Sequence, residues 1–326
     1  MHRRRFAVLL GAGASYGALD DPNSTPPLGD YLFDHLVAHF PKTWGNLDDE
    51  QRSFFVEQDS RPAFERGMLS LWEGEFLRAR SGASFTTVQA LLTDLGLYFA
   101  AFRLPVGVPN CYSALIDLLA RSGLVGRRLG IATLNYDCLI ELALSARRVP
   151  FDLNPNPPRK GILSLWRPHG ACNLLVDGVA NGNMRNITIV AGNYYVAGSG
   201  VRLVAVPPEQ VASIYEGQSN IPPAMSLYAF GKHSPTAPEL IMTLRERWEQ
   251  WARAADVVVV IGARYVPEDL HIWNGIHQGH GSVWYVGDDA SATACAERIG
   301  EERFAHLDHY FKPAIRKLAA RLKILA

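Results

Sequence analysis

The sequence lacks a hydrophobic run long enough to span a membrane. No stretch of about 18 consecutive apolar residues occurs in the 326-residue chain. The first apolar run, Phe6 to Leu10, is also shorter than the ~7–15 residues of a signal-peptide core, although three arginines precede it. We therefore expect a cytoplasmic protein with no membrane partner.

An excess of charge of one sign is missing as well. The 32 lysines and arginines balance 32 aspartates and glutamates, so the formal net charge is zero. Without a global basic field, no direct binding of nucleic acid is expected. The apolar fraction of 48% is ordinary for a soluble globular protein, and the length suits two domains or one large domain with an insertion.

Cysteine pairs of the C-x-x-C type are also absent. The four cysteines are Cys111, Cys138, Cys172 and Cys295. Their spacing fits no structural zinc module, and reduced thiols are the simplest interpretation for a cytoplasmic protein. The sequence therefore predicts no metal site.

What the chain does contain is a short apolar run that leads directly into a glycine-rich turn. Phe6 to Leu10 is followed by Gly11, Ala12, Gly13, Ala14 and Ser15. Because the glycines lack a Cβ, backbone N–H groups can approach a pyrophosphate closely, and a following helix adds its positive end. Such a turn alone is a weak signal, since glycine-rich turns also close ordinary strands.

Strand-like and helix-like segments alternate along the rest of the chain. Further buried strands are predicted at residues 129–134, 163–166, 257–261 and 283–286. This alternation is typical of the α/β class, with a Rossmann-like and mainly parallel sheet.

The helical periodicity is concentrated in one region. It runs from residue 31 to 124 and predicts an inserted helical subdomain, so that residues 1–30 and 125–326 form the Rossmann-type domain. Residues 176–232 are expected to be a loop-rich insertion. Two helices are expected to close the chain, one near residues 290–299 and one from Ala305 onward.

Polar residues and glycines follow the end of each predicted strand. In open parallel sheets, ligands bind outside the carboxyl ends of the strands. The coincidence across five strands predicts a ligand crevice formed by Gly11 to Ser15, Asn135 to Asp137, His169, Gly262 to Arg264, and Gly287 to Asp289.

Several of these motifs together indicate a family. They are Gly11 to Ser15, Thr133 to Asp137 (TLNYD), His169-Gly170 and residues 257–269 (VVVVIGARYVPED). In this order and spacing the chain resembles the sirtuin-like NAD hydrolases of bacterial anti-phage defence systems, over almost its whole length. The resemblance implies a sirtuin-like fold, NAD as the substrate, and cleavage of the bond between nicotinamide and ribose.

The resemblance also implies roles for individual residues. Asn135 and His169 carry catalysis: the Asn135 amide holds a ribose hydroxyl or a water, and the His169 imidazole is a general base. Independently of the resemblance, Asp288 or Asp289 would favour NAD over NADP, because an acid at a strand end binds a ribose hydroxyl. The expected NAD-binding residues are Gly11, Ala12, Gly13, Ala14, Ser15, Leu28, Thr133, Asp137, Gly262, Arg264 and Asp288.

Simpler interpretations of the same residues stay open. Asn135 could cap a helix, His169 could be a structural histidine, and Asp137 is more readily explained as a helix cap than as a ribose ligand. The segment from Asp20 to Leu28, rich in proline, is expected to be a mobile lid.

The chain departs from the deacylating sirtuins at several positions. It has no zinc ribbon, carries Pro26-Pro27-Leu28 where they have Asp-Phe-Arg, and has Leu134 before the expected catalytic residue and Ala263-Arg264 after the late glycine. These differences favour water as the acceptor, and so an NAD glycohydrolase. An NAD-dependent deacylase or ADP-ribosyltransferase and a non-catalytic nucleotide sensor remain alternatives. The resemblance further implies a homo-oligomer, or a partner such as a hexameric ATPase or an Argonaute-like protein.

Overall fold

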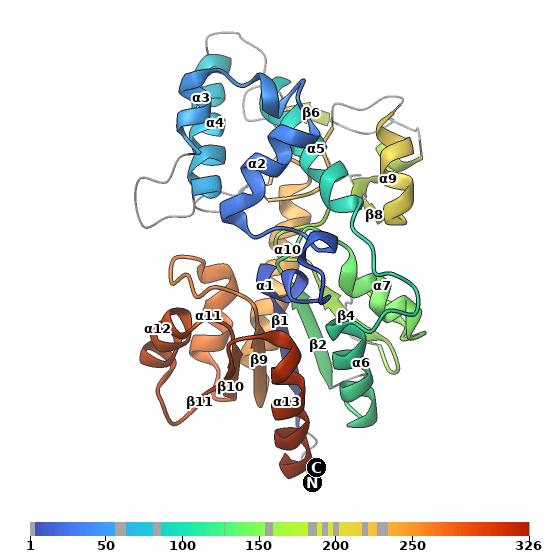
Figure 1. The fold of residues 1–326 in the computed structure, drawn as a ribbon, viewed down its shortest axis with the longest axis vertical. Coiled ribbons are helices and arrows are strands. Elements are labelled where there is room, and N and C mark those ends of the chain that lie inside the picture. The colour runs from blue at the N-terminus through green and yellow to red at the C-terminus, as the bar shows by residue number, and fades with distance from the viewer. Residues whose placement is uncertain are drawn as a thin grey trace.

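A seven-stranded parallel sheet forms the centre of the computed structural model (Figure 1). The strands lie in the order β11-β10-β9-β1-β2-β4-β3, and every neighbouring pair is parallel. The structure describes residues 4–55, 63–80, 86–126, 128–153, 159–181, 188–190, 195–197, 202–216, 221–226 and 234–325. The predicted α/β class with a mainly parallel sheet is confirmed.

Most of the central strands coincide with the apolar runs. The strands of the sheet are β1 (Phe6–Leu10), β2 (Leu129–Thr133), β3 (Phe151–Asp152), β4 (Leu163–Trp166), β9 (Val257–Ile261), β10 (Ser282–Val286) and β11 (Phe304–Asp308). Alternate residues of β1 enter different cores: Phe6, Val8 and Leu10 pack on one face, and Ala7 and Leu9 on the other. A strand that is buried on both faces reads as a continuous apolar run, which is why these segments stand out in the sequence.

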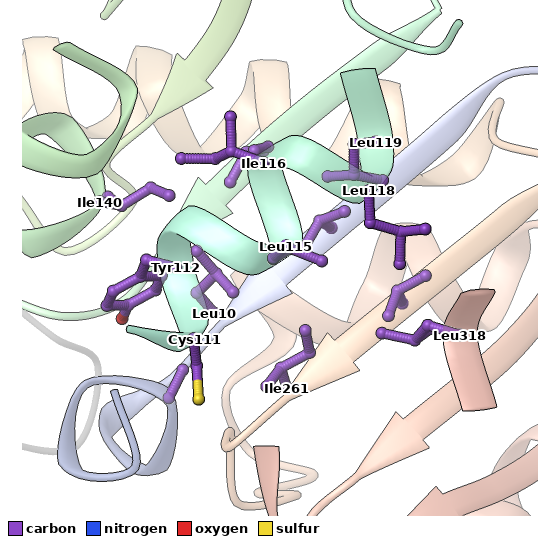
Figure 2. Close-up of a cluster of buried hydrophobic side chains, with 14 of the residues drawn as sticks. Leu10, Cys111, Tyr112, Leu115, Ile116, Leu118, Leu119, Ile140, Ile261 and Leu318 are labelled. Carbon is purple, nitrogen blue, oxygen red and sulfur yellow. The ribbon is translucent and has the colours of Figure 1, made fainter. Parts of the chain in front are cut away.

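Helices cover both faces of the sheet. One face packs against α6 (Cys111–Arg121), α7 (Leu139–Ala146) and α13 (Phe311–Leu325), and the other against α10 (Pro238–Arg253), α11 (Leu270–Gln278) and α12 (Asp289–Ile299). Figure 2 shows Leu115 and its neighbours on α6 facing Leu10 of β1 and Ile261 of β9. Asn110 begins α6 by accepting a hydrogen bond from Ser113 N–H, as an N-cap residue does.

A second layer lies beyond the carboxyl ends of the strands (Figure 1). It contains α2 (Gly29–His39), α3 (Asp49–Ser53), α4 (Ala63–Arg80) and α5 (Thr86–Ala100), with the short turns η1 (Pro22–Ser24) and η2 (Trp44–Asn46). Their aromatic and aliphatic side chains share one core with Tyr136, Cys172 and Val211 from later in the chain. The predicted domain boundaries stay a prediction, and α6, which lies before the boundary at residue 124, packs on the sheet.

The segment expected to be rich in loops contains short elements. They are β5 (Leu174–Val176), α8 (Asp177–Ala180), β6 (Thr188–Val190), β7 (Tyr195–Ala197), β8 (Leu203–Ala205) and α9 (Pro208–Tyr215). β5 pairs with β8 and β6 with β7, both antiparallel. Part of this segment lies outside the described residues.

One expectation about the chain's connections is wrong. Residues 304–308 do not begin the last helix: they form the edge strand β11, which pairs with β10, and α13 begins only at Phe311. The segment after Pro150 contains β3, two residues that pair with β4. Both are edge strands, each paired with a neighbour on one side only. No helix in the described parts of the chain combines the length and the apolar character needed to cross a membrane.

Candidate functional site

The strand order creates a crevice between β1 and β9. From β1 the chain continues to β2, β3 and β4 on one side, and it then returns to β9, β10 and β11 on the other. Ligands of open α/β sheets bind at such a switch point, outside the carboxyl ends of the strands. A cleft of about 670 Å³ lies there, within the range of small-molecule sites.

The residues that line the cleft follow the strands in a fixed sequence. Across β10, β9, β1, β2 and β4 these are, in turn, Asp288, Arg264 with Gly262, Gly11 with Gly13, Asn135, and His169. Neighbouring strands are about 4.8 Å apart, so the ends of β10 and β2 are separated by about 14 Å. The cleft therefore presents an acid at one end, two glycine turns in the middle, and an amide and an imidazole at the other end.

The two glycine turns are packed against each other through their backbones. Gly11 N–H donates to Ile261 C=O and Gly13 N–H to Gly262 C=O, both at 2.9 Å. A Cβ at Gly11 would lie 2.4 Å from the Ala263 Cα, so no side chain fits there. Gly262 has φ +63°, a conformation that favours glycine.

This packing changes the role expected of the glycines. Their N–H groups already have acceptors, so neither is available to a ligand. Within the described chain, the N–H of Ala12 has no acceptor, and Ala12 lines the cleft at the start of α1 (Ala12–Tyr16). Close approach of the two turns, rather than donation by Gly11 or Gly13, is what requires glycine here.

The side-chain amide of Asn135 is oriented by the first glycine turn. Its Nδ2 donates to Gly11 C=O at 2.9 Å, to Ser15 Oγ at 2.8 Å and to Tyr112 Oη at 3.3 Å. Because a carbonyl oxygen can only accept, the contact with Gly11 fixes which end of the amide is the nitrogen. The donor half of the amide is therefore occupied, and Oδ1 is the acceptor left on this cleft-lining residue.

Behind Asn135 lies a buried polar cluster. Ser15 Oγ and Tyr112 Oη are 2.8 Å apart, and Thr133 Oγ1 accepts from the Asn135 N–H at 3.2 Å. Tyr112 lies on α6 with its ring beside the apolar cluster (Figure 2), and burial raises the pKa of its hydroxyl. The cluster thus holds a neutral tyrosine that supports the amide.

Asp137 lies one residue before Cys138, the N-cap position of α7, and its side chain bonds to the start of that helix. Its Oδ1 accepts from Leu139 N–H, the first residue of α7, at 2.9 Å. Burial raises the pKa of the Asp137 carboxyl, while the hydrogen bonds from Leu139 N–H and the Ser15 hydroxyl oppose that shift. Asp137 also lines the cleft, so this bond to α7 does not remove it from the site.

A buried arginine supports the loop that carries Asn135. Arg167 Nη1 donates to the carbonyl oxygens of Asn135 at 2.7 Å and Asp137 at 2.8 Å, and Nη2 is paired with the Glu141 carboxylate. Arg167 is fully buried. Arg167, held by its ion pair with Glu141, therefore fixes the backbone of the loop that carries the Asn135 side chain.

His169 lies in a tight turn after β4. The next residue, Gly170, has φ +77°, and a Cβ there would lie 1.8 Å from the Ala224 carbonyl oxygen. His169 C=O accepts from Ser226 N–H at 2.8 Å. His169 Nε2 lies 2.9 Å from Nε2 of His271 on α11. The turn is thus held by its close contacts with Ala224 and Ser226. The imidazole of His169 is almost completely buried at the cleft wall.

Charged residues concentrate at the other end of the cleft. Asp288 caps α12 through Ser291 N–H at 2.8 Å. Burial favours the neutral carboxyl, but this hydrogen bond and the charge of Arg264 hold the pKa of Asp288 below its usual value. Lys312 on α13 pairs with Asp20 at 2.6 Å across the mouth. The β10 end therefore has an ionised acid near Arg264, and a second cation of the cleft lining, Lys312, is already paired with Asp20.

The segment expected to be a lid forms one wall of the cleft. Asp20, Pro22 and Leu28 line it, facing Phe64 and other residues of the helical layer. Pro22 and Pro27 also line a second cavity, of about 560 Å³, which α2 and α5 enclose on the other side. The segment is thus a thin partition between two cavities.

The structure brings together most of the residues predicted for the site. The cleft is lined by Gly11, Ala12, Gly13, Ser15, Leu28, Asn135, Asp137, His169, Gly262, Arg264 and Asp288. Ala14 and Thr133 are buried and belong to the layer behind the cleft wall. All these assignments to a ligand stay predictions.

Three residues with a clear place in the site were not predicted. Tyr112 belongs to an apolar helix face, Arg167 follows a strand without any motif, and His271 opens a helix 102 residues from its partner. Only the long-range contacts reveal them.

Two cysteines lie near the site without forming a bond. Cys138 and Cys172 Sγ atoms are 3.5 Å apart, and all four cysteines are buried. The neighbouring Cys172 thiol and burial raise the pKa of Cys138. Among the described residues there is no group of three or more metal-ligating side chains.

Comparisons with known proteins give structural neighbours only. No family model and no curated protein matches the sequence. A sirtuin is 16% identical, with 100% of this chain and 95% of that chain covered and a TM-score of 0.40. Sir2 with a p53 peptide and NAD+ is 15% identical, with 99% and 94% covered and a TM-score of 0.40. Sir2 with an inhibitor, 2′-O-acetyl-ADP-ribose and a deacetylated p53 peptide is 14% identical, with 99% and 94% covered and the same TM-score.

Proposed function

We propose that this chain binds NAD in the cleft and hydrolyses the bond between nicotinamide and ribose, giving nicotinamide and ADP-ribose. One observation carries the proposal: the order of groups along the strand ends matches the order of parts in a dinucleotide. An acid suited to a ribose hydroxyl, two tight turns beside a cation, and an amide span about 14 Å across three strand spacings, and the imidazole follows the next strand, β4.

The proposed binding of the pyrophosphate depends on one positively charged side chain and on one backbone N–H group. Arg264 lines the cleft beside the glycine turns and can form charge-assisted hydrogen bonds with phosphate oxygens. The N–H of Ala12 is the backbone donor at the first turn, because Gly11 and Gly13 already bond to the β9 side. The Asp288 carboxylate is ionised at neutral pH and accepts from a ribose hydroxyl.

The chemistry of the bond requires little from the protein. The nicotinamide nitrogen is cationic in NAD and takes the bonding electrons as it leaves, so no general acid is needed. A water oxygen then forms the new bond to C1′ while a base removes its proton. In this scheme Asn135 Oδ1 accepts a hydrogen bond from a ribose hydroxyl or from that water, and His169 takes the proton.

The test is nicotinamide release by the purified protein. His169→Ala is expected to lower the rate by about 10²- to 10⁴-fold, the usual contribution of a general base. Asn135→Ala is expected to abolish most activity as well, and His280→Ala, a change at an exposed histidine outside the cleft, is the matched control. If no nicotinamide appears under any activating condition, hydrolysis is ruled out.

The products separate this proposal from its alternatives. Free ADP-ribose identifies a hydrolase, whereas O-acetyl-ADP-ribose or modified protein identifies a deacylase or an ADP-ribosyltransferase. Tight NAD binding without any product, measured by calorimetry, identifies a nucleotide sensor.

We further propose that the activity serves anti-phage defence and is controlled by assembly, because constant NAD cleavage would deplete the cell. The controlling assembly is a homo-oligomer or a complex with a hexameric ATPase or an Argonaute-like protein. Light scattering of the active fraction tests this: a monomer that cleaves NAD at full rate contradicts it.

A further inference from the structure

One polar neighbour of the His169 ring is a second histidine. His271 lies in the first turn of α11, and its Nε2 is 2.9 Å from the Nε2 of His169. The ring centroids are 5.2 Å apart and the planes are inclined by 46°. The cleft lining in the described chain includes His169 and Asp269 but not His271, so the second ring lies behind the first.

The geometry restricts the protons of the two rings. A hydrogen bond between two imidazole nitrogens needs one N–H and one lone pair, so only one of the two Nε2 atoms carries a proton. Two imidazolium rings would point two N–H groups at each other. The two Nε2 atoms therefore share a single proton.

We propose that His271 is the positioning residue for His169. His169 Nε2–H donates to His271 Nε2, and this fixes the His169 tautomer in which Nδ1 has the lone pair. The proposal rests on the proposed function: when water attacks C1′, the O–H bond breaks and the proton goes to His169 Nδ1. The positive charge formed on the ring is then stabilised by the neutral His271 acceptor, in the way that the third member of a triad orients its base.

Charged residues from several elements line the same cleft as His169 or adjoin the pair along the chain. Asp269 precedes His271 at the start of α11 and lines the cleft, and Asp137 lies on the β2–α7 loop. Arg245 on α10 donates from Nε to Pro168 C=O at 2.9 Å, and burial lowers its pKa. Tyr136 Oη donates to Ser226 C=O. The pair thus has both a cation and carboxylates near it, and the short N–N contact sets its tautomer.

The test compares two substitutions at His271. His271→Phe keeps a ring of similar size without an acceptor, and His271→Gln keeps an acceptor oxygen. His277→Phe is the matched control, because His277 lies on the same helix and bonds instead to Tyr265 at 3.1 Å. All variants are first compared by circular dichroism and thermal unfolding.

Two readouts are used, and the first needs no substrate. Ring ¹⁵N chemical shifts of histidine-labelled protein report the tautomer of His169, whose signals are assigned from a His169→Gln spectrum. In the wild type and in His271→Gln, the Nε2–H tautomer is expected to dominate and to persist through the titration. In His271→Phe that preference is lost, and His277→Phe leaves it unchanged.

The second readout is nicotinamide release. His271→Phe is expected to lower kcat by about 10- to 100-fold, part of the total contribution of a general base, with little change in KM, and His271→Gln is expected to restore most of it. An unchanged His169 tautomer in His271→Phe overturns the inference, as does a changed tautomer with unchanged kcat. If the wild type releases no nicotinamide, the proposed function fails, and the tautomer measurement still decides whether the pair exists.

Discussion

The ion pair of Arg167 with Glu141 allows a quantitative test of how the Asn135 loop is held. Arg167 is 0% exposed and Glu141 7% exposed, and the guanidinium also donates to the carbonyl oxygens of Asn135 and Asp137 at 2.7 and 2.8 Å. Arg167→Met is expected to lower the free energy of unfolding by about 3–5 kcal/mol, because it leaves the carboxylate buried without its partner.

A second substitution separates the contribution of the ion pair to stability from that of the hydrogen bonds to the two carbonyl groups. In Arg167→Met/Glu141→Leu the stranded carboxylate is gone, but the two carbonyl groups still lack their donor, at about 1–3 kcal/mol for each buried group. The double variant is therefore expected to be more stable than Arg167→Met by about 1–2 kcal/mol. The same Glu141→Leu change in the wild type is expected to destabilise the protein, because it leaves a buried cation.

Urea unfolding followed by tryptophan fluorescence measures these differences. The exposed pair of Arg147 with Asp117, at 2.9 Å with 43% and 37% of the side chains exposed, is the control. Removing one of its members is expected to change stability by no more than about 1 kcal/mol. If Glu141→Leu destabilises Arg167→Met as much as it destabilises the wild type, the charges are not coupled and the reasoning is refuted.

Three further predictions concern other parts of the fold. Asn110→Ala removes the N-cap of α6 and is expected to cost about 1 kcal/mol, seen as a lower urea midpoint, whereas Asn110→Ser is expected to restore it. Gly130→Ala places a Cβ 2.4 Å from the Trp166 ring and is expected to cost about 1–3 kcal/mol by overpacking, and an unchanged Tm would contradict this packing. The hydrogen bond from Lys317 lowers the pKa of Asp308, so its contribution to stability is present above pH 4 and is lost as the pH falls further; the Tm of Asp308→Asn should therefore be less sensitive to acid than that of the wild type.

The central strands could be predicted because burial on both faces makes them continuously apolar. β1, β2 and β9 differ from their predicted bounds by at most one residue. β11 was missed because Phe304–Asp308 is an edge strand whose residues are mostly half-buried or exposed. Its strand character comes from pairing with β10, which no local pattern records.

The site could be predicted in outline but not in its internal bonding. Strand ends must meet at one edge of a parallel sheet, so the cleft follows from the strand assignment. The acceptor of the Gly11 N–H, however, is Ile261, 250 positions away, and Asn135 Nδ2 bonds to Tyr112 on a helix that reads as pure core. These long-range contacts decide which N–H groups remain available to a ligand. The spacing of residues in the sequence does not predict such contacts.

The backbone contact between the two glycine turns decides which ligands the cleft can accommodate. The atoms that leave no room for a side chain at Gly11 and Gly262 belong to the backbone, and they cannot rotate away as a side chain does. The β1 and β9 turns therefore move as one body, and the middle of the cleft has a fixed width. The partition from Asp20 to Leu28 has a cavity of about 560 Å³ behind it, and we expect that it can be displaced into that space. Dinucleotide analogues enlarged at the pyrophosphate are thus expected to be excluded, and analogues enlarged toward the partition to be accepted.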